Sequence, residues 1–471
     1  MKKIVNILFL IIAIFTLEAQ ENKLSFTLNE AIDFALKNNR VAKNASLDIE
    51  AAEKLKWETT AIGLPQINAT VDYQNWLKQQ VSLFPAAFSD QHSQIRDLDQ
   101  FYNITPNSNN PIPGAPEGFI PITFGTKQNL IASATLSQLL FDGSYLVGLQ
   151  SAKVFLEISI NAKEKTDLEI RKAVISTYSN VILSEESIDI LENNKSALQK
   201  NLNETVKIYE NGLAEEESVE QLQITFAKIE SALLNAKRLK LIAYQMFNIS
   251  LGLELNTPTL IHDNLEDLVF QNIKLNLIKD SVEIENNVDY KIAQNDKESK
   301  ELLLKLEKSR YLPSLSAFIN GGYAANSDAF TFADSNQKWF GSSLFGVSMN
   351  IPIFSSFGRN AATQRAKIEL DKAEENLTET EQQLLLDIAT AKSNYQFSIQ
   401  LYQTSKQNLN LAERIEKKNQ IKFFEGITTS FDLRQAQMQL YTSQEEYLKS
   451  MIQVINKKAD LETVLNKIES N

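Results

Sequence analysis

The chain has 471 residues and 59 acidic against 47 basic side chains, and its net charge of −12 argues against nucleic acid as a partner. It contains no cysteine and two histidines, which excludes disulfides, thiol nucleophiles and cysteine-ligated zinc, and nearly excludes a histidine-rich metal centre. No Walker loop, HEXXH motif or dinucleotide-binding fingerprint is present. We therefore expect neither an enzyme nor a cofactor or metal.

The N-terminus is predicted to be an export signal. Lys2 and Lys3 precede an apolar run of about fourteen residues from Ile4 to Leu17. That run is too short for a comfortable membrane span, so residues 1–20 are interpreted as a signal peptide. No later run of eighteen apolar residues follows, and we expect no transmembrane helix in the mature chain.

A strand is predicted on each side of a proline-rich stretch. Apolar and polar residues alternate over about 64–75 and again over about 129–141. Such alternation is typical of a strand with one apolar and one polar face. Residues 78–127 between them contain six prolines, and we expect there a long loop on the cell exterior.

Two helices are predicted to follow the second strand. Residues 144–210 contain no proline, and one continuous helix there would reach roughly 100 Å, which requires side-by-side packing with other helices. Gly212 is expected to end this helix with a positive φ and to turn the chain into a helix over 217–253. Apolar residues of the second helix recur in alternating steps of three and four, as in an antiparallel coiled coil. Ser218 is a candidate cap for it.

The second part of the chain repeats this order. Phe141 precedes Gly212 by 71 residues, and Phe354 precedes Gly426 by 72. We interpret residues 21–257 and 280–471 as two structural repeats joined by a linker at 258–279. In the second repeat we expect strands at about 313–323 and 343–354, a long helix at 357–424 and a helix capped by Thr429 or Ser430 at 430–468.

The four predicted strands are each long enough to cross a hydrocarbon layer at a tilt. Four strands do not close into a barrel, and open sheet edges are not tolerated in lipid. Closure therefore requires several copies of the chain, eight strands from two copies or twelve from three. The alternating pattern by itself also fits any half-buried sheet.

The sequence resembles the TolC-like outer-membrane efflux proteins over about residues 24–468. Each motif is short, and the specificity lies in their order and spacing. The motifs that carry the resemblance are FTLNEAIDFALKNNR at 26–40, GLPQIN at 63–68, SQLLFDG at 137–143, YENGL at 209–213, YLPSLS at 311–316, IPIFSSFG at 351–358 and FFEGITTSFDLRQAQ at 423–437.

The resemblance implies a mixed, mainly α fold, in which a long helical barrel of antiparallel coiled coils continues into a twelve-stranded β-barrel made by a trimer. It implies an exit duct in the outer membrane of a Gram-negative bacterium, with a large periplasmic extension. The implied partners are two further copies of the chain, outer-membrane lipid, a periplasmic adaptor and an inner-membrane pump.

The resemblance also places functional residues at the two helical hairpin tips and at the strand–helix junctions. Adaptor docking is expected at the tips, and a gate or selectivity ring at the tunnel mouth. An acidic ring in this family is often found six and nine residues after the second glycine, and the chain keeps the first acid but not the second. The expected residues are Gly212, Leu213, Gly426 and Ile427 for docking, Asp432, Gln435, Glu216, Glu217 and Ser218 for the mouth, and Pro65, Pro313, Phe141 and Phe354 for the junctions.

Alternatives remain open for these assignments. The acidic run at 215–217 also fits the solvated first turn of a helix, where the helix dipole favours negative charge. Asp432 also fits the solvated first turn of a helix, as an alternative to a role at the tunnel mouth. For the whole protein, the competing hypothesis is a periplasmic or surface coiled-coil scaffold without a pore, which would have no need for four membrane-length strands at duplicated positions.

Overall fold

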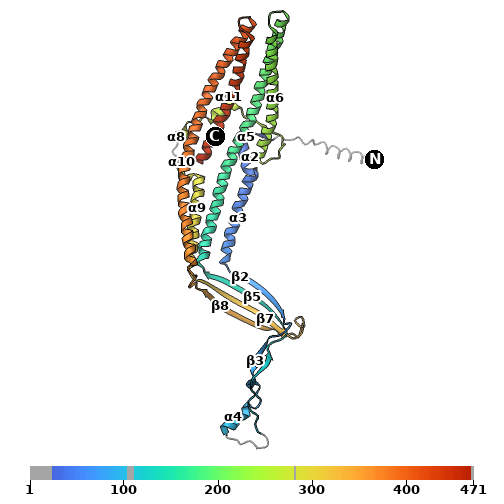
Figure 1. The fold of residues 1–471 in the computed structure, drawn as a ribbon, viewed down its shortest axis with the longest axis vertical. Coiled ribbons are helices and arrows are strands. Elements are labelled where there is room, and N and C mark those ends of the chain that lie inside the picture. The colour runs from blue at the N-terminus through green and yellow to red at the C-terminus, as the bar shows by residue number, and fades with distance from the viewer. Residues whose placement is uncertain (1–23, 103–110, 280–282, 468–471) are drawn as a thin grey trace, which may run out of the picture. The chain divides into compact units, whose positions relative to one another are not determined.

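The computed structural model describes residues 24–102, 111–279 and 283–467 (Figure 1). The predicted signal peptide lies outside these residues. The chain divides into two compact units, and each is described by itself. The first is helical and comprises Met1–Trp57, Leu149–Glu307 and Asn360–Asn471; the second contains the main sheet and comprises Glu58–Gly148 and Lys308–Arg359. No helix in the described part of the chain is both long and apolar enough to cross a membrane.

Four long helices form two antiparallel hairpins. In the first hairpin α5 (Gly143–Glu210) returns as α6 (Glu216–Leu251), and in the second α10 (Gly358–Phe424) returns as α11 (Ser430–Leu465) (Figure 1). The three–four spacing of apolar residues in α6 accounts for its packing, because seven positions of that pattern are buried: Val219, Leu222, Ile229, Leu233, Ala236, Ala243 and Phe247.

The hairpins also contact one another within the helical unit. Asn194 of α5 donates to Gln444 of α11 at 2.8 Å, and Gln420 of α10 donates to Asn201 of α5 at 3.0 Å. Polar contacts of this kind at buried positions fix which helices meet, because an unpaired amide there would be costly.

The main apolar core of the helical unit is formed where shorter elements pack on the long helices. The N-terminal strand β1 (Leu24–Phe26) pairs in parallel with β6 (Thr259–Ile261). Tyr178 of α5 is fully buried beneath this pair and donates to the Phe26 carbonyl at 3.1 Å and to Asp263 at 2.8 Å. The other shorter elements of the first unit are α2 (Leu28–Asn38), α7 (Leu265–Asn272), α8 (Asn276–Lys279), η2 (Ile284–Asn286) and α9 (Val288–Ser309). The helix α3 (Arg40–Ile62) follows α2 and leads into the strands.

The second unit contains a four-stranded antiparallel sheet in the order β2-β5-β7-β8. The strands are β2 (Gln66–Asn75), β5 (Gln128–Phe141), β7 (Ser314–Ser327) and β8 (Phe340–Asn350). Each repeat contributes one adjacent pair, and the central contact of β5 with β7 joins the repeats. Within the described residues, β2 and β8 are the two edge strands.

Three segments differ from the sequence expectation. The predicted loop at 78–127 contains a two-stranded ribbon of β3 (Val81–Pro85) and β4 (Phe119–Thr123), with η1 (Ala86–Ser89) and α4 (Ser93–Tyr102) between them. The predicted linker at 258–279 contains β6, α7 and α8. The fourth strand ends at Asn350 rather than 354, where its pairing with β7 stops at Ser314. Pro313 directly precedes Ser314 and Pro352 lies two residues after Asn350, and a proline has no N–H to donate to the sheet.

Candidate functional site

The register of the sheet puts most of the large apolar residues of the four strands on one face, whereas Ile131, Phe318, Phe340 and Leu344 lie on the other. Ile67 pairs with Leu136, Leu136 with Ile319, and Ile319 with Phe345, so one apolar row crosses the whole sheet. Because side chains alternate along each strand, most other apolar positions fall on the same face. Most of the large residues on this face are exposed in the single chain, among them Ile67 at 74% and Phe345 at 67%.

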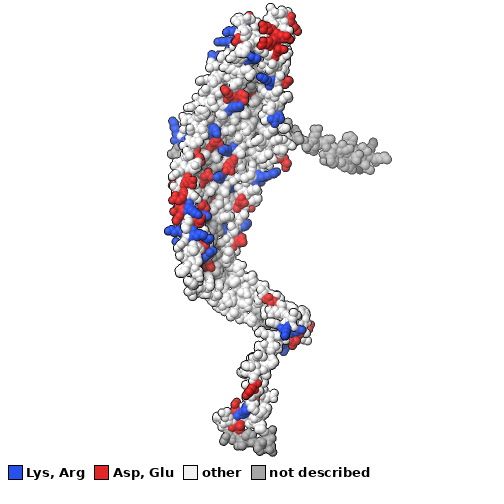
Figure 2. All heavy atoms as spheres, viewed as in Figure 1, with Lys and Arg blue, Asp and Glu red and all other residues white. Residues whose placement is uncertain are grey.

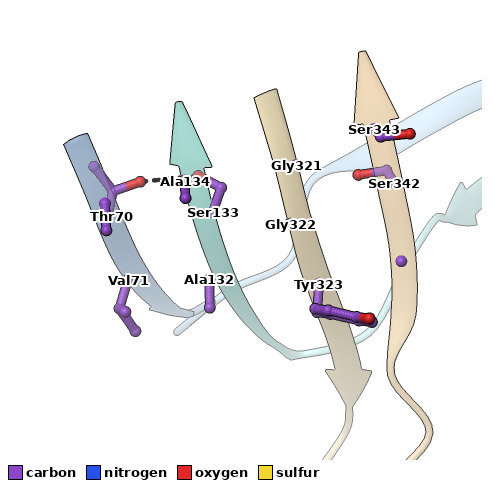
Figure 3. A pocket seen from close by; sticks show the side chains of 12 residues that line it. Thr70, Val71, Ala132, Ser133, Ala134, Gly321, Gly322, Tyr323, Ser342 and Ser343 are labelled. Atoms are coloured by element: carbon purple, nitrogen blue, oxygen red, sulfur yellow. Dashed lines mark hydrogen bonds between the residues drawn. The ribbon is translucent and has the colours of Figure 1, made fainter. Parts of the chain in front are cut away.

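The opposite face of the sheet carries small polar side chains that bond to one another across strands. Thr70 on β2 lies 3.1 Å from the Ser133 hydroxyl on β5 (Figure 3). Asn320 on β7 donates to Thr135 at 2.6 Å. The sheet is therefore apolar on one side and hydrogen-bonding on the other, and Figure 2 shows an almost uncharged surface over these strands.

A hollow of about 670 Å³ lies on the sheet and is bordered by all four strands (Figure 3). Its lining consists mostly of alanine, serine and glycine, and Gly322 approaches β5 so closely that a Cβ there would stand 2.7 Å from the Ala132 carbonyl oxygen. The hollow results from these small side chains, and we assign no ligand to it.

The junction residues are found where strands meet helices. Pro65 immediately precedes β2 and Pro313 immediately precedes β7. Phe141 is the last residue of β5, whereas Phe354 lies outside β8 in the segment leading to α10, where its ring packs on Phe357 at 6.0 Å. The two phenylalanines that the repeat aligns therefore differ in local structure.

A glycine in the first junction makes room for an aromatic ring. A Cβ on Gly63 would stand 2.2 Å from the Tyr145 hydroxyl oxygen, so no larger residue fits without displacing that ring. The Tyr145 hydroxyl donates to the Thr60 carbonyl at 3.1 Å, and Gln138 donates to the Gly63 carbonyl at 2.7 Å. These contacts join the end of α3 to the start of α5.

The two hairpin tips have the same backbone geometry. Gly212 and Gly426 adopt φ of 72° and 70°, in the left-handed region that glycine enters without a steric penalty. At the first tip, the Leu213 N–H reaches the Ile208 carbonyl at 3.0 Å and the Gly212 N–H reaches Tyr209 at 2.8 Å. The same two bonds form at the second tip. Each pair of bonds is a Schellman motif at the C-terminus of the long helix.

Each tip presents one apolar side chain directly after its glycine. Leu213 is 80% exposed and Ile427 is 67% exposed. In a Schellman motif this residue often packs back on its own helix, but here both side chains remain mostly exposed. The two tips thus present matched exposed apolar side chains, and Phe431 beside the second tip is also exposed.

At the second tip Asp432 belongs to a capping box. The Thr429 side chain is the N-cap of α11 and accepts from the Asp432 N–H at 3.2 Å, while Asp432 Oδ2 accepts from Thr429 Oγ1 at 2.7 Å and Thr428 Oγ1 at 2.8 Å. These bonds hold the pKa of Asp432 below its ordinary value, and the bond from the Thr429 side chain contributes most. One carboxylate oxygen is therefore engaged in ending the turn, which supports the structural alternative for this residue.

The first tip is acidic where the second is capped. Glu216 and Glu217 form the first turn of α6 and are exposed, and the N-cap residue Glu215 makes no side-chain capping bond. Figure 2 shows a cluster of acidic side chains over this tip. Ser218 occupies the position that Asp432 has in the second tip, and its hydroxyl donates to Ser430 at 3.0 Å. This bond brings the two tips of one chain together.

Gln435, the residue that departs from the acidic pattern, is exposed on α11 one turn after the capping box. The sequence reasoning missed Thr428 as a partner of Asp432. It also missed Glu416 of α10, a half-buried carboxyl whose pKa is raised by desolvation close to Gln437 of α11. The Thr-x-x-Asp spacing at 429–432 was a readable capping signal, whereas no local pattern marks Glu416. The described residues contain no cluster of three or more His, Asp or Glu arranged to hold a metal ion.

Comparisons with known proteins match the second part of the chain to a family model and the whole fold to solved structures. Residues 282–467, the second repeat, match the family model described as outer membrane efflux protein. No curated protein matches the chain at a significant level.

Solved structures extend the likeness to most of the chain. A crystal structure of CusC has a TM-score of 0.71 at 16% identity and covers 93% of this chain and 92% of its own. VceC from Vibrio cholerae has a TM-score of 0.68 at 15% identity, and the match covers 93% of this chain and 96% of VceC. The CmeC outer membrane channel of Campylobacter jejuni has a TM-score of 0.70 at 16% identity, covering 93% and 85%. At these identities the likeness establishes the fold, which is mainly helical as the sequence predicted.

Proposed function

We propose that the protein is the outer-membrane exit duct of an efflux or secretion system, and that three copies together form a channel. The observation that carries this proposal is the register of the sheet, which places most large apolar side chains of the four strands on one exposed face and the hydrogen-bonding polar side chains on the other. An apolar outer face and a polar inner face are what a transmembrane barrel requires.

Closure of the barrel supports the trimer. The edge strands β2 and β8 each present a row of backbone groups without a partner in the described part of the chain, and lipid does not tolerate such edges. Pairing of β2 in one copy with β8 in the next satisfies both edges and continues the apolar face. Three copies then give the twelve strands expected from the family.

The proposal is tested with the detergent-extracted full chain. We expect it to sediment with the outer membrane, to migrate as a trimer before heating and a monomer after heating, and to conduct ions in planar lipid bilayers. A soluble monomer in the periplasmic fraction without conductance would refute the duct and favour the scaffold without a pore.

We further propose that the hairpin tips contact the periplasmic adaptor of an inner-membrane pump, and that the acidic first tip favours cations at the tunnel mouth. Leu213 and Ile427 support the docking part, since exposed apolar residues at equivalent positions of the two tips fit a shared binding mode. Glu216 and Glu217 support the cation preference, because three copies would concentrate negative charge at one opening.

Single substitutions at the tips test docking. Leu213→Asp and Ile427→Asp should reduce co-purification of a cross-linked adaptor by about tenfold each, the effect of losing roughly 1.4 kcal/mol of contact. Leu213→Met and Ile427→Leu keep the apolar contact and serve as matched controls. Undiminished capture by both aspartate variants would place the adaptor elsewhere.

A further inference from the structure

The segment between β2 and β5 carries a surface that the duct does not account for. The ribbon of β3 and β4 continues the β2–β5 pair: Asn75 pairs with Gln128, the Trp76 N–H bonds the Lys127 carbonyl at 2.9 Å, and Val81 then pairs with Thr123. The ribbon therefore extends one hairpin of the sheet beyond its end.

The two faces of this ribbon are not equivalent. On one face Phe84 packs against Phe88 at 5.8 Å and Phe124 at 5.3 Å. The strand residues of that face, Ser82, Phe84, Ile120 and Ile122, are partly buried. The other face, which we call the open face, consists of Val81, Leu83 and Pro85 on β3 and Phe119, Pro121 and Thr123 on β4. Leu83 is 67% and Phe119 68% exposed, although the face is almost wholly apolar.

Physical chemistry argues that the open face is covered in the assembled protein. A two-stranded ribbon is marginally stable by itself and needs a packing partner for its apolar surface. Neither strand contains a charged residue, so a partner recognised by charge is not favoured. Each strand contains a proline, Pro85 or Pro121, which opposes the addition of a further strand at its edge. The contact therefore has to be made through the face.

Lipid is a poor occupant for this surface. Both outer backbone edges of the ribbon have no partner strand in the described residues, and an open edge is costly in hydrocarbon. Packing of the open face against a second copy of the chain does not place these backbone edges in hydrocarbon. In a trimer the barrel holds three identical ribbons on the same rim, so that even a small apolar area is sufficient because the effective concentration is high.

We propose that the open faces of β3–β4 from neighbouring copies pack against one another and form a shared apolar cluster beyond the barrel. This inference rests on the proposed trimer. The ribbon then makes a second contact between copies, separate from the pairing of the β2 and β8 edges. This contact gives the proline-rich insertion a structural role.

Single cysteines test the contact, since the natural chain has none. Leu83→Cys lies on the open face, and Ser82→Cys is its matched control on the opposite face of the same strand. After mild oxidation of intact outer membranes, Leu83→Cys should give a disulfide-linked dimer of the chain roughly tenfold faster than Ser82→Cys, because the paired faces hold the thiols together.

The reduced form of each variant is assayed for the heat-modifiable trimer and for conductance, which separates this proposal from the duct itself. A conducting trimer in which Leu83→Cys forms the disulfide no faster than Ser82→Cys would refute the contact between open faces but not the proposed exit duct. Linkage of Leu83→Cys to a different protein would also overturn it. Absence of the trimer would overturn both. As a second variant, Leu83→Asp should lower the temperature at which the trimer dissociates, whereas Ser82→Asp should leave it nearly unchanged.

Discussion

At the residue scale, the two hairpin tips share one backbone geometry but differ in how the following helix is capped. Asp432 was expected at the tunnel mouth on family grounds, and its carboxylate completes the cap of α11. Its counterpart Ser218 has no such cap to complete and instead reaches the other hairpin. The two tips share a backbone but divide the roles of charge and capping between them.

The capping role predicts a pH dependence. Because hydrogen bonds hold the pKa of Asp432 below its ordinary value, the cap is fully present above about pH 4 and is lost as the pH falls through the lowered pKa. Thr429→Ala removes the leading bond and should raise that pKa toward the ordinary value, at a cost of about 1 kcal/mol to the helix start. Hydrogen exchange of the first turn of α11 as a function of pH measures both effects.

A gating role for Asp432 requires a different result. Asp432→Asn should then weaken cation preference in bilayer recordings, whereas Thr429→Ala, which keeps the charge, should not. If both variants loosen the tip and neither alters selectivity, Asp432 acts as a cap alone. The double variant Glu216→Gln and Glu217→Gln, recorded for cation preference in the same way, is the comparison at the first tip.

At the scale of elements, the long helices depend on where their few glycines stand. Gly212→Ala should cost about 1–2 kcal/mol, since the penalty is that of a left-handed backbone, and no described atom lies within 4 Å of the added Cβ. Gly148→Ala in α5 is the matched control, because its Cβ would meet Thr59 Cγ2 at an ordinary 3.8 Å. That change should be neutral or gain about 0.5–1 kcal/mol.

Thermal unfolding of the two variants in detergent, followed by helical circular dichroism, checks this pair. Gly212→Ala should unfold at a lower temperature than the parent and Gly148→Ala at the same or a higher one. Equal destabilisation by both would mean that the turn is not what Gly212 provides.

At the scale of the whole molecule, the two faces of the sheet predict opposite tolerance to charge. Phe345→Arg puts a cation on the apolar face and should cost about 2–4 kcal/mol if that face meets the bilayer centre. The neighbouring Leu344→Arg lies on the opposite face and should cost much less. The yield of heat-modifiable trimer in the outer membrane measures the difference, and equal yields would contradict an outward apolar face.

Much of the architecture could be predicted from local patterns. The three–four spacing in α6 indicated its buried positions, the period-two alternation indicated the strands, and the duplicated glycines indicated the tips. The elements inside 78–127 were missed because prolines dominate that segment and β3 and β4 are only five residues each. Glu416 was missed because its burial depends on α11 lying beside it.

The sequence by itself predicted two repeats, each with two alternating strands and two long helices around a glycine turn. These features depend on backbone preference and on contacts between near neighbours in the chain. Only the tertiary structure decided that the four apolar rows share one face, that Ser218 meets Ser430, and that the proline-rich segment presents an open apolar face. A shift of one residue in strand register would reverse each face, and that register is set by hydrogen bonds between segments far apart in sequence.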